Sequence, residues 1–73
     1  QNNPNFKSIL IEWAQKEGKK VQFTLDEEGV HHNKEFTAFV LLENEKIAEG
    51  KGYSKKKAEQ NAAMKACEAL KIN

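Results

Sequence analysis

The sequence predicts an α+β fold, in which two helices pack on one face of a three-stranded antiparallel sheet in the order α-β-β-β-α. Apolar residues recur at helical spacing near both ends of the chain, whereas the middle alternates with the period of two that is typical of strands. Short connections between the middle segments favour pairing of consecutive strands into a meander. The length of 73 residues allows one compact core and no more.

The first helix is predicted from a single apolar stripe. At the spacing i, i+3, i+4, i+7 and i+8 stand Phe6, Ile9, Leu10, Trp13 and Ala14. Either Asn3 or Asn5 can cap the start of this helix, and Gly18 is well placed to end it.

Three strands are predicted in the middle of the chain. Residues 21–25 alternate and are rich in strand-forming residues, residues 26–34 are polar and form a loop, and residues 36–42 form the second strand. A tight turn at 43–45 leads to the third strand, at 46–53. One face of the third strand carries only small residues, namely Ala48, Gly50 and Gly52. These leave space for something to pack closely over the sheet.

The last helix begins after Ser54, a good N-cap residue, and extends to about Leu70. Its predicted inner arc is rich in alanine and consists of Ala58, Ala62, Ala66, Ala69 and Leu70. A stripe of such small residues lets the helix approach a strand that carries glycine.

Positive charge is concentrated in one segment. The formal net charge of the chain is only +1, which by itself does not suggest a polyanionic partner. Residues 46–57, however, hold five lysines and one glutamate, a local charge of +4, while residues 30–45 come to −2. The distribution therefore predicts a basic patch.

The basic patch centres on a helix start. Lys55, Lys56 and Lys57 occupy the first turn of the last helix, where the helix dipole disfavours cations. The same turn presents backbone N–H groups that suit phosphate oxygens. A solvated lysine run is the alternative interpretation, but the capped position preceded by glycine favours phosphate.

Two further segments carry polar groups. His31 and His32 lie in the first loop, where no complete set of metal ligands accompanies them, so we expect one histidine to bond a ribose or phosphate and the other to be exposed. Ser8, Glu12 and Gln15 share a face of the first helix and are able to reach 2′-hydroxyl groups. Without other evidence, an ordinary solvated face explains them better.

Catalysis and membrane insertion find no support in the sequence. No pair of acids lies beside a histidine or a nucleophile in a triad-like pattern. Cys67 is the only cysteine, so an internal disulfide is excluded, a reducing intracellular setting is expected and a packing role is predicted. No segment has the apolar length of a membrane span or the pattern of a signal peptide. We expect residues 1–4 to be a linker remnant, 5–71 the domain and 72–73 a tail.

Three blocks in this order resemble a known family. Residues 5–15, 29–36 and 50–63 together are similar to the double-stranded RNA-binding domain, and the match extends from about Asn5 to Leu70. The segment from Ser54 to Gln60, with Phe6-Lys7-Ser8 at the start of the first helix, most resembles the C-terminal domain of bacterial ribonuclease III.

The resemblance implies three contacts along an RNA duplex of about 16 base pairs. The first helix would lie in one minor groove through Ser8, Glu12 and Gln15. The loop would enter the next minor groove through Val30, His31 and His32, where His32 matches the family's loop histidine. Lys55 and Lys56 would contact the phosphates between them. To these expected contacts we add Lys34, Lys51, Ser54 and Lys57.

The sequence departs from the family pattern at three positions. Glu59 replaces a lysine that would contact phosphate, Val30 or His31 replaces the loop proline, and Ile11 replaces a frequent glutamine. If the parent is ribonuclease III, an endonuclease, magnesium and any dimer contact belong to its catalytic domain, and this domain needs no cofactor. The expected location is cytoplasmic.

Two alternatives to a ribonuclease III parent remain open at this point. One is a non-nuclease RNA-binding protein with the same contacts. The other is a protein–protein module that uses Phe39 and Leu41, which are expected on the sheet face away from the helices unless Gln22 and Thr24 cover them.

Overall fold

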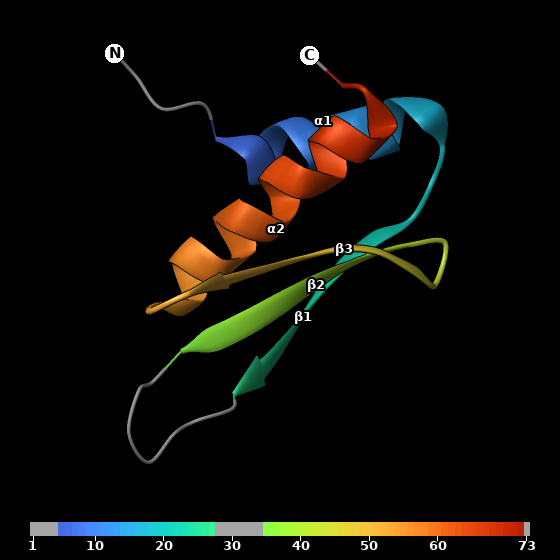
Figure 1. Cartoon of the computed structure of the whole chain (residues 1–73). Coiled ribbons are helices and arrows are strands. Elements are labelled where there is room, and N and C mark those ends of the chain that lie inside the picture. Colours follow the sequence, from blue (N-terminus) through green and yellow to red (C-terminus); the bar gives the residue numbers. More distant parts are fainter. Residues whose placement is uncertain (1–4, 28–34, 73) are drawn as a thin grey trace.

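The order of helices and strands in the computed structural model confirms the predicted α+β fold. Residues 5–27 and 35–72 are described. They form α1 (Phe6–Glu17), β1 (Val21–Glu27), β2 (Phe36–Leu42), β3 (Glu45–Gly52) and α2 (Lys55–Leu70). The sheet has the order β1-β2-β3 with both pairs antiparallel. Both helices cover the same face of this sheet (Figure 1).

Helix α1 is capped at both ends by its own sequence. The Asn5 side chain accepts a hydrogen bond from the Ser8 N–H at 3.2 Å, so Asn5 is the N-cap, while Asn3 lies outside the described residues. Gly18 ends the helix in the left-handed conformation at φ 68°, as predicted. Leu10 and Ala14 are buried, and the other members of the predicted stripe, Phe6, Ile9 and Trp13, pack against the core as half-buried residues.

Strand β1 extends beyond its predicted end. Asp26 and Glu27 pair with Thr37 and Phe36, so the prediction that the loop starts at Asp26 is wrong. The polar character of these residues suggested a loop, but the partner strand β2 supplies a continuous ladder and the backbone follows it.

The β2–β3 turn is tighter than predicted and is tied to the start of β1. Glu43 and Asn44 have φ of 53° and 69°, the left-handed conformations of a two-residue hairpin turn, and β3 therefore begins at Glu45. It ends at Gly52, one residue before the predicted end. The Glu43 N–H donates to the Lys20 carbonyl at 2.8 Å, and the Glu43 carboxylate accepts from the Lys20 N–H.

Helix α2 lies against β3 at backbone distance. A Cβ atom at Gly50 would stand 2.2 Å from the backbone nitrogen of Ala62, and one at Gly52 would stand 2.8 Å from that of Ala58. Gly50 and Gly52 are both buried. The predicted close packing of an alanine stripe on a glycine-bearing strand is confirmed.

The buried arc of α2 differs from the predicted arc in its second half. Ala69 is exposed, so its placement in the arc is wrong, and Ala63 and Cys67 are buried instead. The reason is that this half of α2 packs beside α1, where the Cys67 thiol contacts the Phe6 carbonyl at 3.9 Å. Beyond α2, Ile72 packs against the same core as a half-buried residue.

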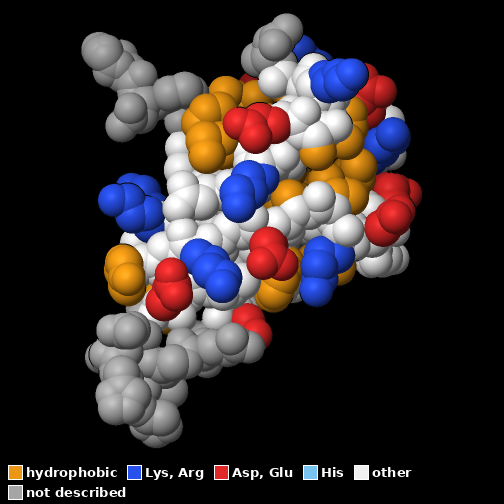
Figure 2. All heavy atoms as spheres, viewed as in Figure 1, with side chains coloured by type: hydrophobic (Ala, Val, Ile, Leu, Met, Phe, Trp, Pro, Cys, Tyr) orange, Lys and Arg blue, Asp and Glu red, His pale blue; other side chains and the backbone are white. Residues whose placement is uncertain are grey.

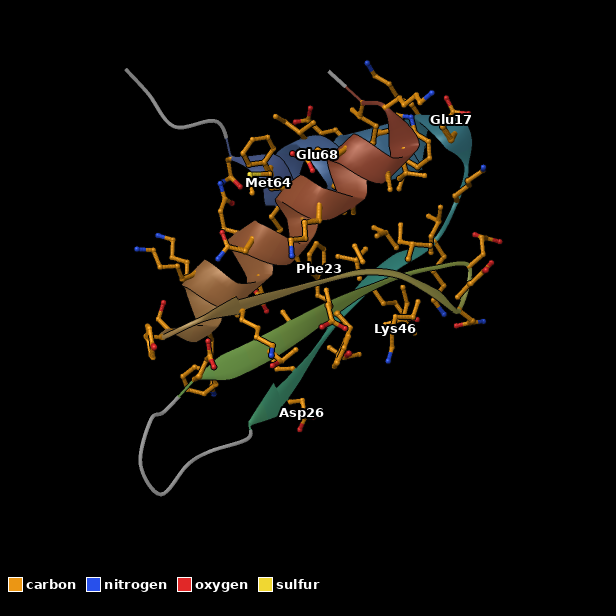
Figure 3. All side chains as sticks on the ribbon, viewed as in Figure 1. Glu17, Phe23, Asp26, Lys46, Met64 and Glu68 are labelled. Carbon is orange, nitrogen blue, oxygen red and sulfur yellow. The ribbon has the colours of Figure 1, made fainter. Side chains whose placement is uncertain are left out.

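The two faces of the sheet differ. Phe23 lies between the sheet and the helices, whereas Lys46 points away from them (Figure 3). On that outer face Phe39 and Leu41 are half-buried, and the Lys46 ammonium stands 4.1 Å from the centre of the Phe39 ring. The expected apolar patch is thus partly covered, and Lys46 lies against its Phe39 ring.

Candidate nucleic-acid interface

The start of α2 holds the lysines of the basic patch in a defined turn. Ser54 is extended, at φ −139° and ψ 158°, and its hydroxyl accepts a hydrogen bond from the Lys57 N–H at 3.0 Å. The predicted N-cap is confirmed. The side chains of Lys55, Lys56 and Lys57 are all exposed at this helix start. A capped turn with three ammonium groups around it suits an anionic ligand.

An open groove of about 640 Å³ separates the start of α2 from the start of α1. The residues that line it come from the N-terminal ends of both helices and include both N-caps: Asn5, Lys7, Ser54, Lys56, Lys57, Glu59 and Gln60. The two helix starts are therefore neighbours, although 48 residues separate the caps in sequence. Figure 2 shows acidic and basic side chains interspersed over the face of the molecule seen in Figure 1, in keeping with the net charge of +1.

One ion pair bridges this groove and was not anticipated from the sequence. Lys7 Nζ lies 2.8 Å from Glu59 Oε1, and the same ammonium is 5.2 Å from the centre of the Phe23 ring. The residues are 52 positions apart, so no local pattern connects them. Their opposite charges, each near the start of a helix, were the only signal. Glu59, recognised above only as a departure from the family pattern, has a structural partner.

The polar face of α1 runs away from the groove. Ser8, Glu12 and Gln15 are separated by four and three residues and are all exposed, so they form one line along the helix. None of them lines the groove, but Ser8 follows Lys7 directly. This line and the lysines of α2 are thus joined at the two helix starts.

Lys51 lies apart from the groove, at the end of β3. Its side chain is exposed, and its carbonyl accepts a hydrogen bond from Asn61 Nδ2 at 2.6 Å. This bond ties the end of β3 to α2, and sequence reasoning missed Asn61 because it has the pattern of an ordinary exposed helix residue.

The predicted contacts of the first loop, Val30, His31, His32 and Lys34, lie outside the described residues. The strands on either side are described. Glu27 pairs with Phe36, and Phe36 pairs with Gly52, two residues before Ser54. The chain therefore leaves β1 and enters β2 at the end of the sheet where α2 begins.

Metal and thiol chemistry have no visible support at this surface. Within 5–27 and 35–72, no three histidine, cysteine or acidic residues gather as a metal site. Cys67 is 3% exposed, and burial raises the pKa of its thiol. Over the same ranges, no helix is long and apolar enough to cross a membrane.

Comparison with known proteins identifies the family of the domain that carries this surface. Residues 6–70 match the family model of the double-stranded RNA binding motif. Similar proteins include ribonuclease 3 of Bacteroides thetaiotaomicron, which is 45% identical over 69 residues, 92% of this chain and 22% of that protein. Ribonuclease 3 of Carboxydothermus hydrogenoformans is 51% identical over 67 residues, 89% of this chain and 28% of that protein.

A third relative, ribonuclease 3 of Bacillus velezensis, is 47% identical over 64 residues, which are 85% of this chain and 26% of that protein. The chain thus spans less than a third of the length of these relatives. Its family match, in contrast, covers nearly all of the described fold, including every lining residue of the groove except Asn5. The chain belongs to the double-stranded RNA binding motif family.

Proposed function

We propose that this domain binds double-stranded RNA by shape, with the lysines of α2 on phosphates and the polar line of α1 in a minor groove. The observation that carries the proposal is the pairing of the two helix starts across one groove. Lys56 lines one side, with exposed Lys55 beside it in the chain, and Ser8 lies just beyond the other side. An A-form duplex presents phosphates and 2′-hydroxyl groups side by side in this way.

The chemistry of each side suits its part of the duplex. Ammonium groups at a helix start neutralise phosphate oxygens and displace their counterions. The hydroxyl of Ser8, the carboxylate of Glu12 and the amide of Gln15 offer acceptors to the 2′-hydroxyl, and two of the three also donate. A carboxylate suits only a donor such as the 2′-hydroxyl, since phosphate repels it.

Removal of Lys55 and Lys56 tests the phosphate contacts. The double variant Lys55→Gln/Lys56→Gln is expected to bind a 20-base-pair RNA about tenfold or more weakly, and to lower the slope of log affinity against log salt by about one per lysine. The matched control Lys16→Gln/Lys65→Gln removes the same charge from exposed positions outside the groove. Equal losses in both variants would leave only a generic charge effect.

Comparison of duplexes tests the groove contacts. RNA is expected to bind more tightly than DNA of the same sequence and length, because the 2′-hydroxyl and the A-form minor groove are absent from B-DNA. Gln15→Ala is expected to reduce this preference while the salt dependence is kept. Equal affinity for the two duplexes would contradict recognition through α1.

We further propose that the domain is the substrate-holding part of a ribonuclease III, a cytoplasmic endonuclease, with catalysis, magnesium and dimer contacts in another domain. The proposal is supported by the names of the similar proteins and by the short share of their length that this chain spans. The 73-residue chain is then expected to bind duplex RNA and leave it intact in the presence of Mg²⁺, while the product of the full gene cleaves it. Cleavage by the short chain would overturn this division.

A further inference from the structure

We propose that Lys7 and Glu59 are positioning residues for RNA binding. Their ion pair fixes the start of α1 relative to the start of α2, and with it the spacing between the minor-groove contacts and the phosphate contacts. The inference rests on the proposed function and deepens it, because it assigns a role to two residues that are not themselves expected to read the duplex.

The pair lies between the two proposed contact regions. Lys7 directly precedes Ser8 on α1, and Glu59 lies one helical turn after Lys55 and Lys56 on α2. The 2.8 Å contact between Lys7 Nζ and Glu59 Oε1 therefore spans the groove where the two regions meet. Loss of this ion pair therefore changes the distance between the two contact regions while the contact residues within each region stay the same.

The two helices are held in different ways, and this difference is why an ion pair between them matters. Backbone contacts with Gly50 and Gly52 fix α2 on the sheet. Helix α1 packs on α2 through side chains, and side chains allow small shifts and rotations that a backbone contact does not. The Lys7 ammonium also stands over the Phe23 ring, so one side chain joins α1, α2 and β1.

The environment of the pair sets the size of its effect. The Glu59 side chain is 21% exposed and that of Lys7 is 40% exposed, so solvent screens the pair only in part. Exposed ion pairs shift an equilibrium by up to about fivefold. If the pair favours the binding-competent arrangement of the helices, its loss lowers RNA affinity by about two- to fivefold at most.

A simple charge effect predicts the opposite sign for Glu59. A glutamate beside phosphates repels them, so its neutralisation would tighten binding if charge alone mattered. If the ion pair positions the two helices, its loss weakens RNA binding even though a negative charge has been removed. The sign of this one change separates the two explanations.

The first experiment measures the affinity of the 73-residue chain and its Glu59→Gln variant for a 20-base-pair RNA at two salt concentrations. We expect Glu59→Gln to bind about two- to fivefold more weakly. The matched control is Glu68→Gln, which removes the same charge from an exposed position near the other end of α2. The control is expected to bind RNA with the affinity of the unsubstituted 73-residue chain.

The second experiment exchanges the charges. Lys7→Glu and Glu59→Lys are each expected to weaken binding, although Glu59→Lys adds positive charge next to the phosphates. The double variant Lys7→Glu/Glu59→Lys exchanges the two charges and so restores an ion pair. It is expected to recover the RNA affinity of the unsubstituted chain. Circular dichroism at the binding temperature shows that each variant is folded, so the affinities report on geometry and not on unfolding.

The outcomes separate this proposal from the function it rests on. Tighter binding by Glu59→Gln or Glu59→Lys, or a double variant no better than Lys7→Glu, would overturn the positioning role and leave RNA binding in place. Failure of the unsubstituted chain to bind duplex RNA would overturn both the positioning role and the proposed RNA-binding function.

Discussion

The two helices of this domain are attached to it by different means. Helix α2 uses small residues, and its backbone reaches that of β3 at Gly50 and Gly52. Helix α1 uses large side chains, of which Leu10 is fully buried, and rests mainly on α2. Close backbone contact leaves almost no freedom of position, whereas large side chains can repack. The start of α2, where we propose phosphate contacts, is therefore the fixed part of the proposed interface, and the polar line of α1 is the adjustable part.

The largest effect is expected from a side chain in the fixed attachment. Gly50→Val would place atoms against the backbone of Ala62, which cannot move without α2, so we expect a loss of about 3 kcal/mol or more in the free energy of unfolding. Urea denaturation measures it. Gly18→Ala is the comparison, since nothing lies within 4 Å of that site and only its positive φ of 68° is strained, at about 1 kcal/mol. Equal losses would show that α2 is not held by close approach.

A smaller effect is expected at the start of the adjustable helix. Asn5→Ala removes the cap of α1 and is expected to lower the free energy of unfolding by about 1 kcal/mol. Amide hydrogen exchange should rise in the first turn of α1 and stay unchanged in α2. Ser54→Ala, the equivalent change in α2, is expected to expose the first turn of α2 instead. Loosening of both helices by either variant would contradict their separate attachment.

The smallest effect is expected where the helices meet, at Cys67. Burial raises the pKa of this thiol, so the folded chain keeps its proton when the unfolded chain has already lost it. The free energy of unfolding is then expected to fall as the pH rises above the ordinary thiol pKa, and to be unaffected by this group at lower pH. Urea denaturation from pH 7 to 10 should show a shallower decline in Cys67→Ala. Identical pH profiles would mean that the thiol is not desolvated between α1 and α2.

The fold and the start of α2 followed from the sequence because their signals are local. Helical stripes, alternation, Gly18 and Ser54 each act within a few residues, and they placed every element to within two residues of its ends. The errors arose where contacts with distant segments determine where a strand ends or which side of a helix is buried. Strand β1 continues to Glu27 because β2 pairs with it, and Ala69 is exposed because α1 redirects the inner arc of α2.

The proposed interface was predictable in its parts and not in its arrangement. Exposure of the α2 lysines and of the polar line on α1 follows from helix periodicity. The meeting of Lys7 with Glu59 depends on how two helices cross, and no spacing within either helix encodes it. The bond from Asn61 to the Lys51 carbonyl is likewise a product of the tertiary fold.

The glycine-to-alanine contact between β3 and α2 also has a consequence for variation of this domain. The residues in closest contact, such as Gly50 on β3 and Ala62 on α2, are buried, whereas Lys55 and Lys56 are exposed at the start of α2. Substitutions on the outer side can strengthen or weaken attraction to a polyanion without disturbing this contact. Substitutions at Lys55 and Lys56 are therefore expected to change the charge of this surface while the packing of α2 on the sheet is kept.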